Sequence, residues 1–198
     1  MFMPAPVLTD GELTVRPIRM RDAKQLEREL MFNRSWLRQW EATLPGTFNH
    51  FDTKAMIRSL IAYGRSGGGL PMVLEVDGNL VGQINVSGIT HGSLSSASIG
   101  YWVAERFAGR GFTPRAVALV TDYCFLGLGL HRIEICIRPE NAASLRVVNK
   151  LGFRFEGRRD RFIHINGDWR DHDCFALCVD DMPEGVLARF NSRKTNTP

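Results

Sequence analysis

Hydrophobic positions in the middle of the chain change their period several times. Residues 99–103 form a short apolar run with aromatic side chains, which is typical of a strand. Apolar residues then recur with helical spacing over 117–124 and alternate with polar ones over 132–138. Asn141 opens a second helical pattern, which Gly152 ends. This stretch therefore predicts strand, helix, strand, helix.

The flanking segments complete an α+β pattern. Alternating runs on either side of Asp77-Gly78 and of Asn166-Gly167 predict two hairpins, because both dipeptides favour the tight turn of that motif. Helical spacing predicts further helices over 22–31, 52–65 and 180–190. The strands joined by the central helix should be parallel, with a right-handed crossover. We therefore predict an α+β fold with one mixed sheet.

Composition limits the classes of protein that this chain can belong to. Its 198 residues, 44% of them hydrophobic, suffice for one core, so we expect a single domain over 1–198 with loose tails at 1–10 and 191–198. No apolar run approaches the roughly 20 residues that span a bilayer, and the first ten residues lack the features of a secretory signal. The four cysteines show no metal-ligand spacing, so we expect buried thiols, no metal and a cytoplasmic location. The net charge of +4 suits an anionic ligand, but the sequence holds no nucleic-acid-binding motif.

A glycine loop follows the strand at 99–103. Gly109 and Gly111 flank Arg110, and Thr113-Pro114 is the expected start of the central helix. Backbone N–H groups at a helix N-terminus, backed by the helix dipole, bind anions. Two glycines can also serve simply as a turn, so the loop alone leaves both interpretations open.

Four segments, taken in order, point to a family. They are Ile99-Gly100-Tyr101-Trp102; Gly109-Arg110-Gly111; Leu130-His131-Arg132-Ile133-Glu134; and Pro139-Glu140-Asn141 with Ser144, followed by Lys150-Leu151-Gly152-Phe153. Their order and spacing resemble the GNAT family of acetyl-CoA-dependent N-acetyltransferases, and most closely its Rim-type group, which acetylates protein N-termini, including those of ribosomal proteins. The resemblance covers nearly the whole chain. It implies a GNAT-like single domain in which two parallel strands splay apart around acetyl-CoA.

The resemblance also implies which residues hold acetyl-CoA. The pantetheine arm would pair with the backbone of Trp102, Val103 and Ala104, where an N–H would polarise the thioester carbonyl. The pyrophosphate would lie over residues 109–115. Asn141 would be a helix cap, a cofactor ligand, or both. The cofactor contacts expected in the loop and helix are those of Gly109, Arg110, Gly111, Phe112, Thr113 and Arg115.

The phosphate loop departs from the family pattern Gln/Arg-x-x-Gly-x-Gly/Ala. It fits in two registers, 106–111 and 108–113, and we prefer the second because the phosphates need the helix N-terminus. Pro114 removes one N–H from that helix. We therefore expect Arg110, Arg115 or the Thr113 hydroxyl to contact the phosphates instead.

Acetyl transfer needs a proton acceptor for the amine and a donor for the leaving thiolate. The resemblance assigns the donor to Ser144, whose alternative is a first-turn hydroxyl without a catalytic role. Glu134 is the best base candidate, with an ion pair to Arg132 or Arg138 as an equal alternative, and ordered water could also serve. Weaker candidates, because a histidine beside an aspartate in a strand is more often structural, are His131, His164, His172 and Asp171. Cys136 is expected to be a core thiol, since direct transfer needs no acyl-enzyme.

The acceptor side is less defined. Trp36 and Trp40 are four residues apart, which places them on one helical face, and in the family this stretch borders the acceptor cleft. Either tryptophan could line the substrate site or pack in the core. The resemblance implies acetylation of a protein N-terminal amine, and we expect a monomer or homodimer. Its alternatives are a small-molecule amine as acceptor, or a non-catalytic acyl-CoA-binding module, which the altered loop would suit.

Overall fold

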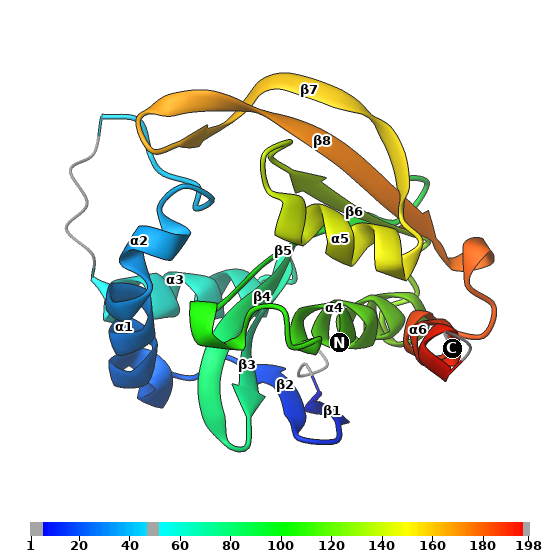
Figure 1. Cartoon of the computed structure of the whole chain (residues 1–198), viewed down its shortest axis with the longest axis horizontal. Helices are drawn as coiled ribbons and strands as arrows, with labels where there is room; N and C mark the ends of the chain where they lie inside the picture. Colours follow the sequence, from blue (N-terminus) through cyan, green and yellow to red (C-terminus); the bar gives the residue numbers. More distant parts are fainter. Residues whose placement is uncertain (1–5, 47–51, 196–198) are drawn as a thin grey trace.

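The computed structural model describes residues 6–46 and 52–195 and is built around one eight-stranded sheet (Figure 1). The strands lie in the order β1-β2-β3-β4-β5-β6-β8-β7, and among these described strands the β5–β6 pair is parallel while all other pairs are antiparallel. Their bounds are β1 Leu8–Asp10, β2 Leu13–Pro17, β3 Gly69–Val76, β4 Asn79–Thr90, β5 Ser96–Val103, β6 Arg132–Ile137, β7 Arg154–Ile165 and β8 Asp168–Cys178. The predicted α+β class, the mixed sheet and the parallel pair are confirmed.

In the described part of the chain, six α-helices cover the two faces of the sheet (Figure 1). They are α1 Ala23–Phe32, α2 Arg34–Leu37, α3 Thr53–Arg65, α4 Phe112–Asp122, α5 Ala142–Leu151 and α6 Val186–Thr195. Along β3, Val73 joins the core beneath α1 and α3, whereas Met72 and Leu74 join the larger core beneath α4 and α5. This alternation is what the two-residue period of a strand dictates. No helix in these described ranges is long and apolar enough to cross a membrane.

Local signals in the sequence position the elements around the site. The Asn141 side chain accepts the Ser144 backbone N–H at 3.1 Å and so caps α5, which ends at Gly152 with a φ of 82°. Asn166 and Gly167 have φ values of 49° and 89°, as the tight turn between β7 and β8 requires. The long β7–β8 hairpin that results arches over one end of the sheet (Figure 1).

Three local expectations were wrong. Leu8–Asp10 pair with β2, and α6 extends to Thr195, so neither terminal segment is loose there; the rest of the expected tails, 1–5 and 196–198, lies outside the described residues. The central helix begins at Phe112 rather than at Thr113-Pro114, because Gly111 adopts a φ of 85° and turns the chain into the helix earlier. Trp36 and Trp40 do not share one helix, since α2 ends at Leu37.

The parallel pair opens after three residues. Ser96, Ala97 and Ser98 lie opposite residues 132–134, and no further pairing between β5 and β6 follows in the described structure. Beyond this point β5 continues to Val103 with β4 alone as its partner. The open edge of β5 therefore faces the space from which β6 has turned away.

Candidate functional site

Two cavities open where β5 and β6 separate. The hairpin cavity, about 360 Å³, extends toward the β7–β8 hairpin; the loop cavity, about 150 Å³, extends to the glycine loop and the N-terminus of α4. The side chains that line both are Leu37, Trp40, Tyr101, Trp102, Asn141 and Ser144. The two cavities therefore meet at the end of β5 and the first turn of α5, and together they form one continuous candidate site.

The glycine loop lines the loop cavity as the preferred register requires. Ala108, Gly109, Gly111 and Thr113 all line it, and the first N–H groups of α4 have no partner within the helix. Arg106, which the other register places at the phosphates, instead binds both carboxylate oxygens of Glu29, at 2.7 and 2.8 Å. The geometry therefore favours the register 108–113.

The basic residues at the loop cavity differ from those expected. Arg115 binds Asp10 at the end of β1 and Glu12 in the β1–β2 turn. Its side chain is 14% exposed, and Arg115 does not line the cavity. Arg110 lies over the rings of Phe107 and Phe112, and neither Arg110 nor Phe112 lines the cavity.

Positive charge is supplied by α5 instead. Arg146 and Lys150 line the loop cavity and are both exposed. Their spacing of four residues places them on one helical face, on the same helix as Ser144. Sequence reasoning missed both residues, although the helical spacing of Ala143, Arg146, Val147 and Lys150 was a signal that could have found them.

At the end of β5 only part of the expected backbone is accessible. The Ala104 N–H donates to the Val81 carbonyl at 2.7 Å, and Ala104 is fully buried and lines neither cavity, so its expected role in pairing is not supported. Because hydrogen-bonding direction alternates along a strand, the backbone groups of Val103 point to the open edge. There the Val103 carbonyl accepts the indole N–H of Trp36 at 3.3 Å.

Tyr101 and Ser144 lie side by side where the cavities meet. Burial raises the pKa of the Tyr101 phenol above its usual value, and the Ser144 side chain beside it offsets part of that rise. Tyr101 therefore keeps its proton at neutral pH. Ser144, the donor that the resemblance implies, lines both cavities, and Tyr101 was given no role in the sequence analysis.

Trp40 is held at the edge of both cavities by Arg138. The Arg138 guanidinium lies 5.4 Å from the centre of the Trp40 ring and donates to the Gln39 carbonyl at 2.7 Å. Arg138 also pairs with Glu140 at 3.2 Å. These contacts fasten the segment after α2 to the end of β6. Trp40 lines both cavities, whereas Trp36 lines the loop cavity and not the hairpin cavity.

The β7–β8 hairpin is fastened to the same segment. The Thr43 N–H donates to the His164 carbonyl at 2.8 Å, and the Thr43 hydroxyl lies 2.8 Å from His164 Nδ1. Ala42 also forms a single bridge with Ile165. Residues 42 and 165 both line the hairpin cavity, so these contacts close one of its edges.

His172 lines the hairpin cavity as a neutral base. It is 4% exposed, and its Nδ1 lies 3.0 Å from the Arg170 carbonyl oxygen, which can only accept. Nδ1 therefore carries the proton, and Nε2 is left as an acceptor. Burial lowers the pKa of His172; Arg138 also lowers it, while the Arg170 carbonyl, Asp171 and Glu140 act in the opposite direction.

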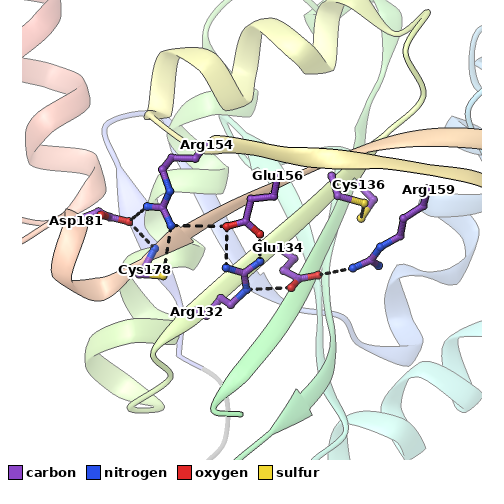
Figure 2. Close-up of polar contacts among 9 residues, drawn as sticks. Arg132, Glu134, Cys136, Arg154, Glu156, Arg159, Cys178 and Asp181 are labelled. Atoms are coloured by element: carbon purple, nitrogen blue, oxygen red, sulfur yellow. Dashed lines mark hydrogen bonds and ion pairs between the residues drawn. The ribbon is translucent and has the colours of Figure 1, made fainter.

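Glu134 belongs to a row of ion pairs that crosses β6 and β7 (Figure 2). Its carboxylate accepts from Arg132 at 2.9 Å and from Arg159 at 3.4 Å. The row continues from Arg132 through Glu156, Arg154 and Asp181. Glu134 lines neither cavity, and Arg138 pairs elsewhere. The geometry thus favours the ion-pair alternative over the role of base.

Cys136 is the cysteine that lines a cavity, and its surroundings disfavour a role as nucleophile. Cys136 lines the hairpin cavity, with its sulfur 2.7 Å from that of Cys174, and burial together with this neighbouring thiol raises the pKa of Cys136. A thiol with a raised pKa is a poor nucleophile at neutral pH. In the part of the chain that the structure describes, no group of three or more His, Cys, Asp or Glu residues could hold a metal.

Comparisons with known proteins agree with this geometry. A profile of the acetyltransferase (GNAT) domain matches residues 12–154. Mycobacterium smegmatis RimJ, solved in complex with a coenzyme A disulfide, is similar with a TM-score of 0.86 and 36% identity, over 96% of this chain and 93% of that one. An Escherichia coli alanine N-acetyltransferase of ribosomal protein uS5 is 27% identical over 92% of this chain and 96% of its own length. The probable N-acetyltransferase YjcK of Bacillus subtilis is 41% identical over 105 residues, which are 53% of this chain and 58% of that protein.

Proposed function

The chain belongs to the GNAT family of acetyl-CoA-dependent acetyltransferases, and from this premise we propose that it acetylates the N-terminal amine of a protein. The observation that carries the proposal is the junction of the two cavities at Ser144. One cavity is suited to an anionic cofactor and the other is free for an acceptor. A module that only bound acyl-CoA would need the loop cavity but would have no use for the hairpin cavity, which also opens at Ser144.

The residues of the loop cavity fit acetyl-CoA. The free N–H groups of α4, together with Arg146 and Lys150, would hold its phosphates, and the open edge of β5 at Val103 would pair with its pantetheine arm. Trp102 and Val147 supply apolar walls. Bound there, acetyl-CoA supplies a thioester whose carbonyl carbon an amine can attack.

Coenzyme A affinity should depend on Arg146 and Lys150 rather than on Arg115. Each alanine substitution on α5 is expected to weaken binding by about 1.5–3 kcal/mol at low salt, because a charge-assisted contact is lost. The loss should shrink as salt rises, since both side chains are exposed. Calorimetric titration of coenzyme A at two salt concentrations measures this.

Arg115→Ala is the matched control for this prediction. It should keep coenzyme A affinity and lower the melting temperature, because Asp10 and Glu12 lose their partner. Weaker coenzyme A binding in Arg115→Ala, with unchanged binding in the α5 variants, would place the phosphates elsewhere.

In the proposed reaction, the acceptor nitrogen bonds to the thioester carbonyl carbon and the carbon–sulfur bond breaks. The nitrogen gives up one proton and the departing thiolate gains one, so the products are an N-acetyl amide and a free thiol. We assign the donor to Ser144, which regains a proton from solvent after the thiol has left; Tyr101, which lines both cavities with Ser144, stays protonated. We assign the acceptor of the amine proton to Nε2 of His172 in place of Glu134, because His172 lines the hairpin cavity and Glu134 does not.

The choice of a protein N-terminus rests on the comparisons. The Escherichia coli relative that aligns with most of this chain is named as an alanine N-acetyltransferase of ribosomal protein uS5. Alanine has no side-chain amine, so an N-terminal amine is the acceptor that this name suggests. The hairpin cavity, at about 360 Å³, has room for the first residues of a peptide. Trp40, Cys136 and Ile165 line it alongside His172.

A panel of acceptors tests this proposal. Turnover of acetyl-CoA is measured with peptides that carry free N-termini, with the same peptides blocked at the N-terminus but containing lysine, and with small amines. We expect free N-termini to give the highest kcat/KM. A preference for small amines would support the alternative acceptor class, and binding of acetyl-CoA without turnover of any acceptor would contradict an enzymatic role.

A further inference from the structure

We propose that Gly100 and Asn85 form the floor of the hairpin cavity, where Gly100 admits the first side chain of the acceptor and limits its size, and Asn85 binds the acceptor's N–H. This inference rests on the proposed function, because it concerns the acceptor of the same reaction. Both residues line the hairpin cavity and neither lines the loop cavity. They are thus placed to contact the acceptor without contacting the cofactor.

Nothing in the backbone or the packing requires glycine at position 100. Gly100 does not have a positive φ, and a Cβ built on it meets no heavy atom within 4 Å. The other glycines of the 198-residue sequence either have a positive φ or would place a Cβ against a neighbouring atom. At Gly100 the missing side chain therefore serves neither a turn nor a close approach, and its effect is to leave space in the cavity.

Asn85 lies directly opposite Gly100 in the β4–β5 pair. Opposed residues in an antiparallel pair project to the same face, so the space above Gly100 borders the Asn85 side chain. Asn85 Oδ1 is buried and has no hydrogen-bond partner among the described residues. A buried acceptor without a partner costs free energy, and a ligand N–H placed over Gly100 would remove that cost.

The remaining walls indicate what kind of substituent fits. Leu37 and Trp102, which pack in the core beneath α1 and α3 on the face to which Gly100 projects, line the same cavity and make the space beside the floor apolar. An apolar pocket of fixed shape discriminates by size, because close-packed walls do not readily move apart. The acceptor chemistry that suits this floor is a primary amine whose carbon bears a small apolar group.

Gly100→Ala and Gly100→Val test the size limit. Both should fold, since the backbone conformation is ordinary and the added atoms enter open space. The acceptors are peptides that differ only in their first residue: glycine, alanine, valine or leucine. One carbon in an apolar pocket changes kcat/KM by roughly 10- to 200-fold, so Gly100→Val is expected to lower the alanine-to-glycine ratio of kcat/KM by at least about tenfold.

Asn85→Ala tests the hydrogen bond. It should lower kcat/KM for all the peptides by a similar factor, on the order of tenfold, because the N–H it binds is common to them. The coenzyme A dissociation constant should stay unchanged in all three variants. The matched control is Ser98→Val, which adds bulk two residues earlier on the same face of β5, where the side chain is exposed and lines neither cavity.

The outcomes separate this inference from the function on which it rests. A changed ratio in Gly100→Val, but not in Ser98→Val, supports the size limit. Wild-type turnover of peptides with the same first-residue preference in Gly100→Val would overturn the inference and leave the proposed function intact. Absence of turnover with every peptide would overturn both.

Discussion

Replacement of Ser144 with alanine is expected to lower kcat by about 10²–10⁴ and to leave the coenzyme A dissociation constant near its wild-type value. The Ser144 hydroxyl meets the sulfur mainly as the thiolate departs, so its loss affects the transition state more than the bound ground state. Its backbone N–H, which Asn141 binds at 3.1 Å, is retained in the variant, so the start of α5 should be preserved. Steady-state kinetics and calorimetry on the same preparation measure the two quantities.

Ser98→Ala is the control for this prediction, because that serine is exposed on β5 and lines neither cavity. It should keep wild-type kcat. If Ser144→Ala instead lost coenzyme A affinity and turnover by the same factor, Ser144 would be a binding residue. If kcat were unchanged, the proton would reach the thiolate by another route, and Tyr101→Phe would be the next variant to measure.

Replacement of His172 with glutamine is expected to lower kcat by about 10²–10⁴ and to remove the acid limb of its pH profile. Burial lowers the pKa of His172 from its usual 6.5, so in the wild type kcat should fall as the pH drops below 6.5 and the ring becomes protonated. kcat at saturating acceptor is the quantity to follow, because the free amine itself titrates near pH 8 and affects kcat/KM. The charged groups that act on His172 are Arg138, Asp171 and Glu140, so these should stay unchanged in the variant.

The stability of the fold sets the lower pH limit for this experiment. A histidine whose folded pKa lies below its unfolded value contributes stability that is present above pH 6.5 and is lost as the pH falls from there through the folded pKa. Melting temperatures should therefore accompany the rates. A fall in rate without a fall in melting temperature belongs to the chemistry.

Glu134→Gln is the matched comparison for His172→Gln. It should keep both kcat and the acid limb, because Glu134 contacts Arg132 and Arg159 rather than either cavity. The substitution should lower the free energy of unfolding alone, by roughly the 0.2–1 kcal/mol typical of partly exposed ion pairs. The reverse result, with the acid limb lost in Glu134→Gln and kept in His172→Gln, would restore Glu134 as the base.

The elements of the fold could be predicted because their signals are local. The alternation along 132–138, the cap at Asn141 and the turn at Asn166-Gly167 each act within a few residues, and all three appear in the structure as expected. The start of α4 could not be placed, because Gly111 and Thr113 both carry a plausible start signal, and only the backbone shows which one the chain uses.

The site was predicted less well because its electrostatics depend on distant partners. Arg115 sits beside the expected phosphate loop in sequence, but Asp10 and Glu12, over 100 residues away, hold it in ion pairs. In the sequence, nothing distinguishes His172 from a structural histidine in a strand. It lines the hairpin cavity because the β7–β8 hairpin arches over the end of the sheet where β5 and β6 separate (Figure 1). Long-range pairing of this kind leaves no periodic signal in the sequence.

The short parallel pairing also has a consequence for how variants of this protein should be interpreted. Strands β1 to β5 and strands β6 to β8 form two blocks. Among the residues that the structure describes, three pairs join these blocks in the sheet: Ser96 with Arg132, Ala97 with Ile133 and Ser98 with Glu134. The cavities lie along the same seam, so a change that loosens the seam alters the distance between the two walls of the site. A substitution far from the bound substrate, such as one in the core beneath α4, can then weaken substrate binding without removing any contact to the substrate. A genetic screen that measures activity alone would not separate such variants from variants of residues that contact the substrate.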